Sequence, residues 1–512
     1  MDSEKNTAVG RKSLLRRHAK LTLRYVRMFV LWAAAGLVIG ALGGLIGTAF
    51  CYAIREATQL RGAYPWLLYF LPAGGLLIVW LYRLRGMHPT DTNGVLLDGT
   101  EKMTPQTGRD IYIEGGRIGA VADAAARRED YEVVDLGGQY VLPGLINLHV
   151  HLPASGKPKK KASDPKKLVK LITANALTRR IGVKLCEGYA KTELLSGVTT
   201  IRTVGGVADF DTIIRDLAAQ GKILSPRVVA SNMAVSVPGG HMAGSLAYEA
   251  KTPEEAAAYV ERIAAEKPDL IKLMITGGVL DAKEKGTPGE LKMEPDMVRA
   301  VCDKAHELGF IVAAHVESTE GARMALECGV DSIEHGAAPT DEVMRLFKEG
   351  NSFLCTTLSP ALPYALFDRS VSCASEVEQF NGNMVFEGII ANAKAALEQG
   401  IPVALGNDVG CPWVTQYDFW RELCYFEKYV GVSRSFALHT ATLRNAQLAG
   451  IGDITGSIEV GKEADMIVTA TNPLDDLRAL RTVKHVIHRG HLIVSPCVKR
   501  KSVVDRELDK FL

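Results

Sequence analysis

The first chemical signal in this sequence is a pair of histidines one residue apart, His149 and His151. They end the apolar run 141–146, whose composition predicts a buried strand. Alternate side chains of a strand point to the same side. The two imidazoles can therefore aim at one point, and the pair predicts a metal site.

Later apolar stretches supply four further residues of ligand type: Lys272, His315, His335 and Asp408. Lys272 lies among leucine, isoleucine and methionine, where an unpaired ammonium would carry a large desolvation cost. A carboxylate partner, either Glu334 or Asp408, would remove that cost. Addition of CO2 to the neutral amine would also remove it, because the carbamate is an anion whose two oxygens can bind two metal ions. Buried lysines readily lose the proton that this chemistry displaces.

These residues need a scaffold that brings the ends of separate strands together. The sequence alternates apolar stretches with longer helix-like stretches, such as 253–266, 294–308 and 383–399. We expect eight strands, at 140–151, 199–206, 227–236, 270–278, 311–318, 332–336, 353–360 and 403–410. This alternation predicts an α/β fold, a (β/α)8 TIM-like barrel, whose chemistry sits at the C-terminal ends of the strands. The ligand-type residues fall at strands one, four, five, six and eight.

The barrel is assigned to residues 140–453, and short strands with glycine turns flank it on both sides. Residues 93–139 and 454–500 carry these strands, and we expect them to pair into one small β-sandwich domain. Residues 1–92 differ in kind. A basic N-terminus there is followed by two uncharged apolar stretches, each long enough to cross a hydrocarbon core of about 30 Å as a helix. A pair of buried helices is the alternative.

The distribution of charge around the two stretches, 28–54 and 62–82, predicts their orientation. Eight lysines and arginines precede the first stretch, whereas two lie between the stretches and two follow the second. Positive charge is retained on the cytoplasmic side of a membrane. We therefore expect a protein held in the membrane by two transmembrane helices, with the catalytic domain facing the cytoplasm.

The composition excludes some classes of protein. A net charge of +2 gives no electrostatic argument for binding nucleic acid. Nine cysteines without a CxxC pair argue against a disulfide scaffold and against a cysteine metal cluster. The basic stretch 157–170 is either a solvated insertion or a contact with acidic lipid headgroups. Assembly into homo-oligomers stays open.

Five motifs together resemble the amidohydrolase superfamily: Pro-Gly-Leu-Ile-Asn-Leu-His-Val-His (143–151), Gly-Val-Thr-Thr-Ile-Arg (197–202), Ile-Lys-Leu-Met-Ile-Thr-Gly-Gly (271–278), Ile-Glu-His-Gly (333–336) and Gly-Ser-Ile-Glu-Val-Gly-Lys-Glu-Ala-Asp (456–465). The resemblance covers about 95–495 and is greatest to the imidazolonepropionase-related, prolidase-like branch. It implies a binuclear metal centre with a carboxylated lysine. His149 and His151 then correspond to ligands of the more buried metal, Lys272 to the bridging carbamate, and His315 and His335 to ligands of the second metal.

Asp408 corresponds to the aspartate that binds metal and shuttles a proton. In the implied mechanism, a hydroxide that bridges the metals attacks the scissile carbonyl, and Asp408 passes its proton to the leaving nitrogen. Nitrogen and oxygen ligands favour Zn²⁺, with Mn²⁺ or Co²⁺ as alternatives. Asn147 stands where many members have aspartate, and we expect this difference to alter hydrogen bonding around the ligands rather than their number.

The implied substrate is a small-molecule amide whose C–N bond is cleaved, either an N-acyl amino acid or an Xaa-Pro-type dipeptide. A cyclic amide or lactone hydrolase of the same superfamily is the alternative. His241, in a glycine-rich loop after strand three, is expected to act in catalysis by contacting the substrate or its carbonyl. Tyr364 could line the pocket after strand seven. Arg202 could bind a substrate carboxylate or pair with a buried acid, and structural pairing is favoured.

The N-terminal segment resembles the first two helices of the chloride channel (CLC) family, through the glycine-rich run 36–47 and the run 71–80. The ion-binding Gly-Ser-Gly-Ile-Pro loop of that family does not occur in the sequence, and no ion conduction is inferred. An alternative from another class is therefore a truncated channel-like membrane protein with a fused soluble domain.

Overall fold

A computed structural model describes Arg55 and residues 94–123, 131–158 and 164–512. The chain divides into two units, Met1–Thr90 and Asp91–Leu512, and all of the described residues except Arg55 belong to the second. The predicted transmembrane stretches and the chloride-channel resemblance therefore lie outside the described residues. Within the described ranges, no helix has the length and apolar character needed to cross a membrane.

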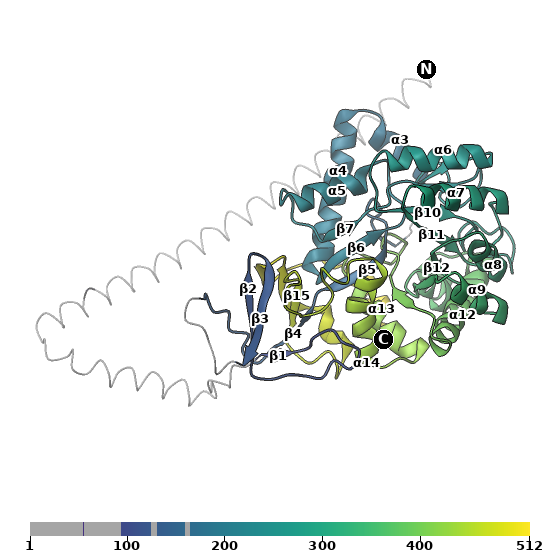
Figure 1. Ribbon diagram of the computed structural model, residues 1–512. Coiled ribbons are helices and arrows are strands. Elements are labelled where there is room, and N and C mark those ends of the chain that lie inside the picture. The colour runs from purple at the N-terminus through teal and green to yellow at the C-terminus, as the bar shows by residue number, and fades with distance from the viewer. Residues whose placement is uncertain (1–54, 56–93, 124–130, 159–163) are drawn as a thin grey trace, which may run out of the picture. The chain divides into compact units, whose positions relative to one another are not determined.

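Parallel strands surrounded by helices form the barrel (Figure 1). Hydrogen bonds join its strands into two parallel runs, β5-β6-β7 and β8-β10-β11-β12-β13-β14. A parallel bridge between Val150 and Val409 brings the end of β5 against the segment after β14. The predicted TIM-like α/β fold is confirmed. The strands are β5 (Leu145–Val150), β6 (Val198–Thr203), β7 (Arg227–Val229), β8 (Ala234–Ser236), β10 (Leu270–Met274), β11 (Ile311–Val316), β12 (Ser332–His335), β13 (Phe353–Thr356) and β14 (Val403–Leu405), with β9 (Ala247–Glu249) beside β8.

Two predicted strands are each divided in the structure. The first divides at Gly144, where the preceding β4 (Tyr140–Pro143) belongs to a different sheet from β5. A Cβ atom at Gly144 would lie 2.1 Å from Oγ1 of Thr199, so only glycine fits at this crossing. The third divides into β7 and β8, and Asn232 between them has a φ of +60°. Asparagine tolerates this left-handed conformation, which interrupts the ladder.

The two ends of the second unit meet in a separate sheet of order β1-β4-β15-β16-β17. Its other strands are β1 (Val95–Leu96), β15 (Met466–Thr469), β16 (Val483–His488) and β17 (His491–Val494). A hairpin of β2 (Arg109–Glu114) and β3 (Arg117–Asp123) contributes Ile118 to the apolar cluster that contains Val141 and Met466. The hairpin and the sheet therefore share one small core, apart from that of the barrel.

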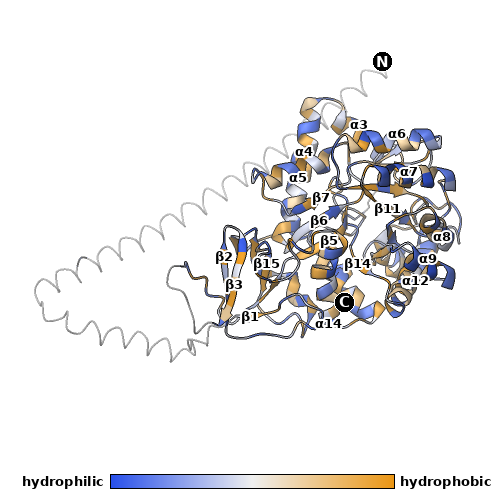
Figure 2. Ribbon diagram, in the orientation of Figure 1, coloured by the Kyte–Doolittle hydropathy of each residue, from blue (hydrophilic) through white to orange (hydrophobic). Residues whose placement is uncertain are grey.

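The helices around the barrel are amphipathic, and Figure 2 shows hydrophilic and hydrophobic residues sharing each of α6–α9. In α9, for example, Thr340 caps the first turn, and Val343, Met344 and Phe347 are buried. The longer helices are α3 (Pro165–Thr173), α4 (Ala176–Leu195), α5 (Phe210–Ala219), α6 (Pro253–Ala264), α7 (Pro295–Glu307), α8 (Thr319–Glu327), α9 (Asp341–Glu349) and α12 (Glu376–Glu398). Shorter ones are α10 (Leu362–Leu366), α11 (Arg369–Ser372), α13 (Phe419–Tyr425), α14 (Arg434–His439), α15 (Asn445–Leu448) and α16 (Ser502–Leu508).

Candidate metal centre

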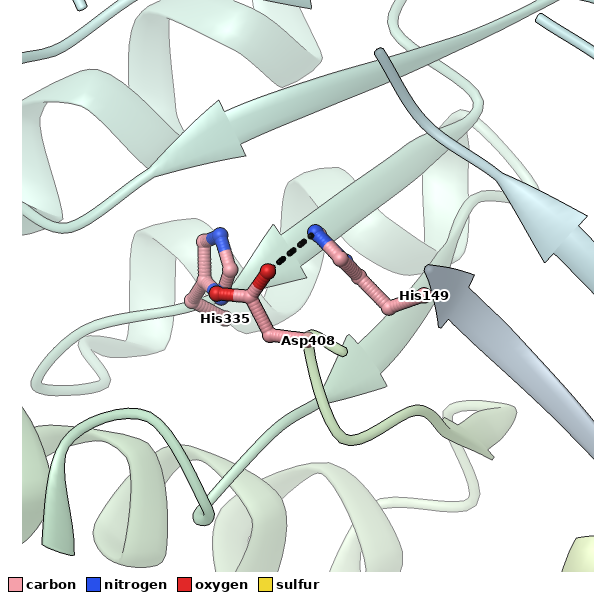
Figure 3. Close-up of side chains that lie close together, drawn as sticks. All are labelled: His149, His335 and Asp408. Atoms are coloured by element: carbon pink, nitrogen blue, oxygen red, sulfur yellow. Dashed lines mark ion pairs between the residues drawn. The ribbon is translucent and has the colours of Figure 1, made fainter. Parts of the chain in front are cut away.

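The predicted ligand residues lie at the C-terminal ends of five barrel strands, and all are buried. They are His149 and His151 at β5, Lys272 on β10, His315 on β11, His335 at the end of β12 and Asp408 after β14. Figure 3 shows His149 and His335 on either side of the Asp408 carboxylate. Potential ligand atoms of these three side chains lie within 4.8 Å of one another, which is close enough to share a metal ion.

The histidine rings form a continuous series across the end of the barrel. Ring centroids are 5.4 Å apart for His151 and His149, 4.7 Å for His149 and His335, and 4.7 Å for His335 and His315. His241 continues the series, because its ring stacks on that of His315 with centroids 4.1 Å apart. The barrel therefore brings together imidazoles from four different parts of the sequence.

One nitrogen of each ligand-type histidine is held by a neighbouring group. The contacts are His149 Nδ1 to Glu334 Oε2 at 2.7 Å, His151 Nδ1 to the Gly205 carbonyl at 2.8 Å, His335 Nδ1 to Thr357 Oγ1 at 2.7 Å and His315 Nε2 to the Gly277 carbonyl at 3.4 Å. The opposite nitrogen of each ring is turned away from that group, and those of His149 and His151 lie 3.6 and 3.2 Å from Oδ1 of Asp408. Metal-binding histidines are usually oriented through their second nitrogen in this way.

Three of the buried histidines, His149, His315 and His335, favour the neutral form. Burial lowers the pKa of His149 to about 4, although the Asp408 carboxylate opposes this shift. Burial also lowers the pKa values of His315 and His335 well below their usual range. Neutral imidazole is the form that binds a metal ion, so these rings are suited to ligation near neutral pH.

The amine of Lys272 has no hydrogen-bond partner in the described part of the chain, although the side chain is buried. Burial lowers the pKa of Lys272 to about 8, against the attraction of Glu334. Neither carboxylate proposed from the sequence bonds to it. Because a neutral, unpartnered amine can add CO2, and the resulting carbamate would be satisfied by metal ions, these residues fit a binuclear centre.

Arg202 pairs with a buried acid, Glu334, which is one of the two roles that the sequence left open for it and the one that it favoured. Its guanidinium donates to Oε1 and Oε2 of Glu334 at 2.7 and 2.8 Å and to the Leu148 carbonyl at 2.7 Å. The side chain is 1% exposed, so its charge is already used in a buried ion pair. Although burial opposes it, Arg202 holds the pKa of Glu334 well below its usual range, which keeps this carboxylate ionised beside His149.

Two of the ligands occupy a backbone conformation that is unfavourable for their residue types. His335 has a φ of +69° and Asp408 a φ of +57°. Such conformations cost about 1–3 kcal/mol each and concentrate at functional sites. Gly406 permits a related close approach, since a Cβ atom there would lie 2.4 Å from Cβ of His149. The turn after β14 is thereby set against β5, which brings Asp408 to the histidines.

Of the remaining candidates, His241 lies beside the metal ligands. Its Nδ1 contacts Oδ2 of Asp281 at 2.5 Å, and Asp281 also accepts the Gly278 amide at 2.9 Å. Tyr364 lies in α10 and is only 6% exposed. Burial raises the pKa of its hydroxyl. His241 thus lies at the edge of the predicted ligand set with its ring held by Asp281, whereas Tyr364 is a core residue.

The sequence reasoning did not assign roles to several groups beside the ligands. Asp281 orients His241, and the thiol of Cys411 donates to Oδ2 of Asp408 at 3.1 Å. Glu317, two residues after His315, accepts the Val279 amide at 2.9 Å, and burial raises the pKa of Glu317 to about 8. These acids lie in loops, where no periodicity marks them. Only Glu334 had a sequence signal, because it immediately precedes a ligand.

A cavity of about 500 Å³ lies next to His315 and His335. Glu317 and Ala337, which line it, each lie two residues after a ligand histidine. Leu291, Met384 and Val385 make part of its wall apolar. The cavity could therefore receive an uncharged part of a substrate whose reacting bond lies at the metal centre.

Comparison with known proteins agrees with this geometry. The sequence model of the amidohydrolase family matches residues 140–493. Ochratoxinase from Aspergillus niger is 25% identical over 334 residues, which span 60% of this chain and 67% of that protein. Imidazolonepropionase from Symbiobacterium thermophilum is 26% identical over 399 residues, which span 71% of this chain and 84% of that protein.

Solved structures give the same result for the fold. A Bifidobacterium longum protein described as a prolidase candidate is 37% identical, with a TM-score of 0.72, over 81% of this chain and 97% of its own. A Xaa-Pro dipeptidase solved with methionine in its active site is 30% identical, with a TM-score of 0.69, over 78% of this chain and 98% of its own. The family match begins at residue 140, so it gives no support to the chloride-channel alternative for residues 1–92.

Proposed function

Because this chain belongs to the amidohydrolase family, we propose that it is a metal-dependent hydrolase that cleaves a C–N amide bond in a small molecule. The observation that carries the proposal is the buried amine of Lys272, which has no hydrogen-bond partner among the described residues, beside four histidines that are each oriented through one ring nitrogen. A structural lysine would have a carboxylate partner there.

In this proposal, His149 and His151 would hold one divalent ion, and His315 and His335 would hold a second. Lys272, once carboxylated, and Asp408 would supply the anionic ligands. The ions are Zn²⁺, with Mn²⁺ or Co²⁺ as alternatives. When bound, they supply a nucleophilic water near neutral pH and polarise the scissile carbonyl.

The protein's own groups then position the substrate and move the proton. Oδ1 of Asp408 lies 3.2 Å from His151 Nε2 and 3.6 Å from His149 Nε2, which places this carboxylate at the centre of the ligand set. Asp408 accepts the proton of the attacking water and delivers it to the leaving nitrogen. His241 donates from Nδ1 to Asp281, and in its protonated form it also donates from Nε2 to the substrate carbonyl as negative charge develops there.

We propose an N-acyl amino acid or an Xaa-Pro-type dipeptide as the substrate. The similarity to a Xaa-Pro dipeptidase over 78% of the chain supports this class, and so does the largely apolar cavity next to the ligands. An apolar acyl group or side chain would lose water-exposed surface on entering the cavity, which favours binding. Residues 1–92 would hold the enzyme in a membrane, with its catalytic domain on the cytoplasmic side.

The test uses the full-length protein purified in detergent. We expect about two divalent ions per chain, and hydrolysis within a panel of N-acyl amino acids and Xaa-Pro dipeptides that increases when bicarbonate is added. Cyclic amides and lactones in the same panel examine the alternative substrate class. Lys272→Ala should lose both metal and activity, whereas Lys484→Ala, at an exposed position on β16, should retain both. Metal-free protein with activity unchanged in Lys272→Ala would refute the proposal.

A further inference from the structure

The helical hairpin α3–α4 presents an unusual concentration of exposed apolar side chains. Five leucine and isoleucine residues within 18 positions are 46–69% exposed: Leu168, Leu171, Leu177, Ile181 and Leu185. Other exposed large apolar residues of the described part occur singly or in pairs along the sequence, which is ordinary for a protein surface. A cluster of this kind on one hairpin indicates a surface that binds something.

These side chains are exposed because the two helices bury other faces against the protein. In α4, Gly182, Cys186 and Ala190 face the protein and are buried. The stripe of Leu177, Ile181 and Leu185, at spacing i, i+4 and i+8, is on the exposed side. Helix α3 buries no side chain fully, although it is strongly amphipathic. Val169, Ile172 and Val183 pack against the core, whereas the five leucine and isoleucine side chains of the cluster stay exposed in the described structure.

Positive charge surrounds these apolar side chains. Residues 164–191, which make up the described hairpin, contain seven lysines and arginines and only two acidic residues. Lys166 and Lys184 form ion pairs with Glu249 and Glu187, at 2.9 and 2.6 Å. Lys167 pairs with Asp164 at 3.8 Å, and Arg179 pairs with Asp209. Lys170 and Arg180, which flank the leucines, are exposed. The surface therefore combines apolar side chains with basic groups available to a negatively charged partner.

We propose that the α3–α4 hairpin docks on the surface of an anionic phospholipid bilayer. Its leucine and isoleucine side chains would enter the boundary between headgroups and acyl chains, while lysine and arginine bind lipid phosphates. This combination is typical of helices that lie in a membrane interface. A symmetric contact with a second copy of this chain would instead bring two strongly basic surfaces together. The charge therefore favours the bilayer.

The hairpin lies close to the loop that carries His241, so its docking bears on the candidate metal centre. Lys166 at the start of α3 pairs with Glu249 of β9, and Gly244 lies close to the same lysine. The segment between β8 and β9 also carries His241. The docked hairpin would therefore lie beside the loop that reaches the metal ligands. The docking itself does not depend on the proposed hydrolysis.

The experiment compares full-length protein reconstituted in phosphatidylserine-containing vesicles and in pure phosphatidylcholine vesicles. Residues 1–92 would insert equally into both kinds of vesicle. A difference in the hydrogen exchange of peptides within 165–191 therefore reports on the hairpin alone. We expect markedly slower exchange in the anionic vesicles alone. Each basic side chain near such a surface contributes about fivefold to binding, so Lys170→Glu with Arg180→Glu should abolish the difference.

A second pair of variants tests the apolar contribution. Leu171→Gln with Ile181→Gln should also remove the protection, whereas Leu224→Gln with Val460→Gln, at exposed positions elsewhere, should retain it. Metal content and melting temperature report whether each variant is folded. Equal exchange in both kinds of vesicle would overturn the proposal. So would protection that depends on protein concentration in detergent, because that outcome identifies a second copy of the chain as the partner.

Discussion

The carboxylate of Glu334 contacts Nδ1 of His149 at 2.7 Å, and this contact fixes which nitrogen of the imidazole is free for a metal ion. The same carboxylate accepts two hydrogen bonds from the buried guanidinium of Arg202. A charged chain of three residues from β6, β12 and β5 therefore orients one ligand. The charge of Glu334 and the geometry of its contacts can be tested separately.

Replacing Glu334 with glutamine should weaken metal binding. The amide keeps the shape of the side chain but removes the negative charge that orients His149 and makes it more basic. Loss of such a supporting group typically lowers metal affinity about 10–100-fold. Competition with a chelator measures the change, and Glu349→Gln, which alters an exposed ion pair on α9, is the control. Unchanged affinity would show that the contact does not support the ligand.

Replacing Arg202 with methionine should destabilise the protein rather than impair substrate binding. Removing one member of a buried ion pair leaves Glu334 uncompensated, which typically costs about 3–5 kcal/mol. The melting temperature should therefore fall clearly, whereas the KM of remaining folded enzyme should change little. A large rise in KM at unchanged stability would instead assign Arg202 to the substrate.

Carbamate formation at Lys272 should depend on pH in a defined direction. The pKa of Lys272 is lowered to about 8, so the fraction of neutral amine increases as pH rises to that value. The experiment adds CO2, at fixed pressure, and metal to metal-free protein and measures the rate at which activity returns. This rate should rise by up to about tenfold per pH unit below pH 8 and then level off. A rate that stays constant between about pH 6 and about pH 8 would argue against a titrating amine.

His241 and its partner should affect catalysis without affecting the metal content. In His241→Asn, the donor to the substrate carbonyl is misplaced, and loss of one such donor typically lowers kcat about a hundredfold or more. Asp281→Asn should have a smaller effect because it only loosens the orientation of the ring. Metal analysis accompanies the kinetics. If either variant loses metal, the residue supports the ligands rather than the substrate.

Glu193 offers a test of stability against pH that is remote from the proposed chemistry. It is fully buried on α4, and neither carboxylate oxygen has a hydrogen-bond partner among the described residues. Burial, followed by the charge of Asp418, raises the pKa of Glu193 well above 4.5. The folded protein therefore holds this proton more tightly than the unfolded chain. Wild-type stability should decrease as pH rises from 4.5 towards that raised pKa.

Glu193→Gln removes this titration. Its melting temperature should exceed that of the wild type at pH about 7 and approach it at pH about 5, since each unit of pKa shift corresponds to about 1.4 kcal/mol. The comparison at the two pH values cancels effects on packing that do not depend on protonation. A constant difference between variant and wild type would show that Glu193 does not titrate in this range.

Much of the scaffold could be predicted from the sequence, because barrel strands are short, apolar and separated by amphipathic helices. The pattern failed where the backbone departs from regular structure. Gly144 and Asn232 divide two predicted strands, since one allows a close crossing and the other a left-handed turn. The spacing of apolar residues does not indicate where a close crossing or a left-handed turn interrupts a strand. The pairing of β4 with β15, which are more than 300 residues apart, likewise depends on the closed fold.

The sequence by itself determined the types of ligand available and the strands that end in them. Local spacing places His149 and His151 on one side of a strand, and burial of Lys272 follows from its apolar neighbours. Only the tertiary structure decided which groups meet across the barrel: Glu334 with Arg202 rather than with the lysine, His241 with Asp281, and an apolar face of α3–α4 with no partner. These outcomes depend on distances between residues remote in sequence, which are set by packing of the whole domain.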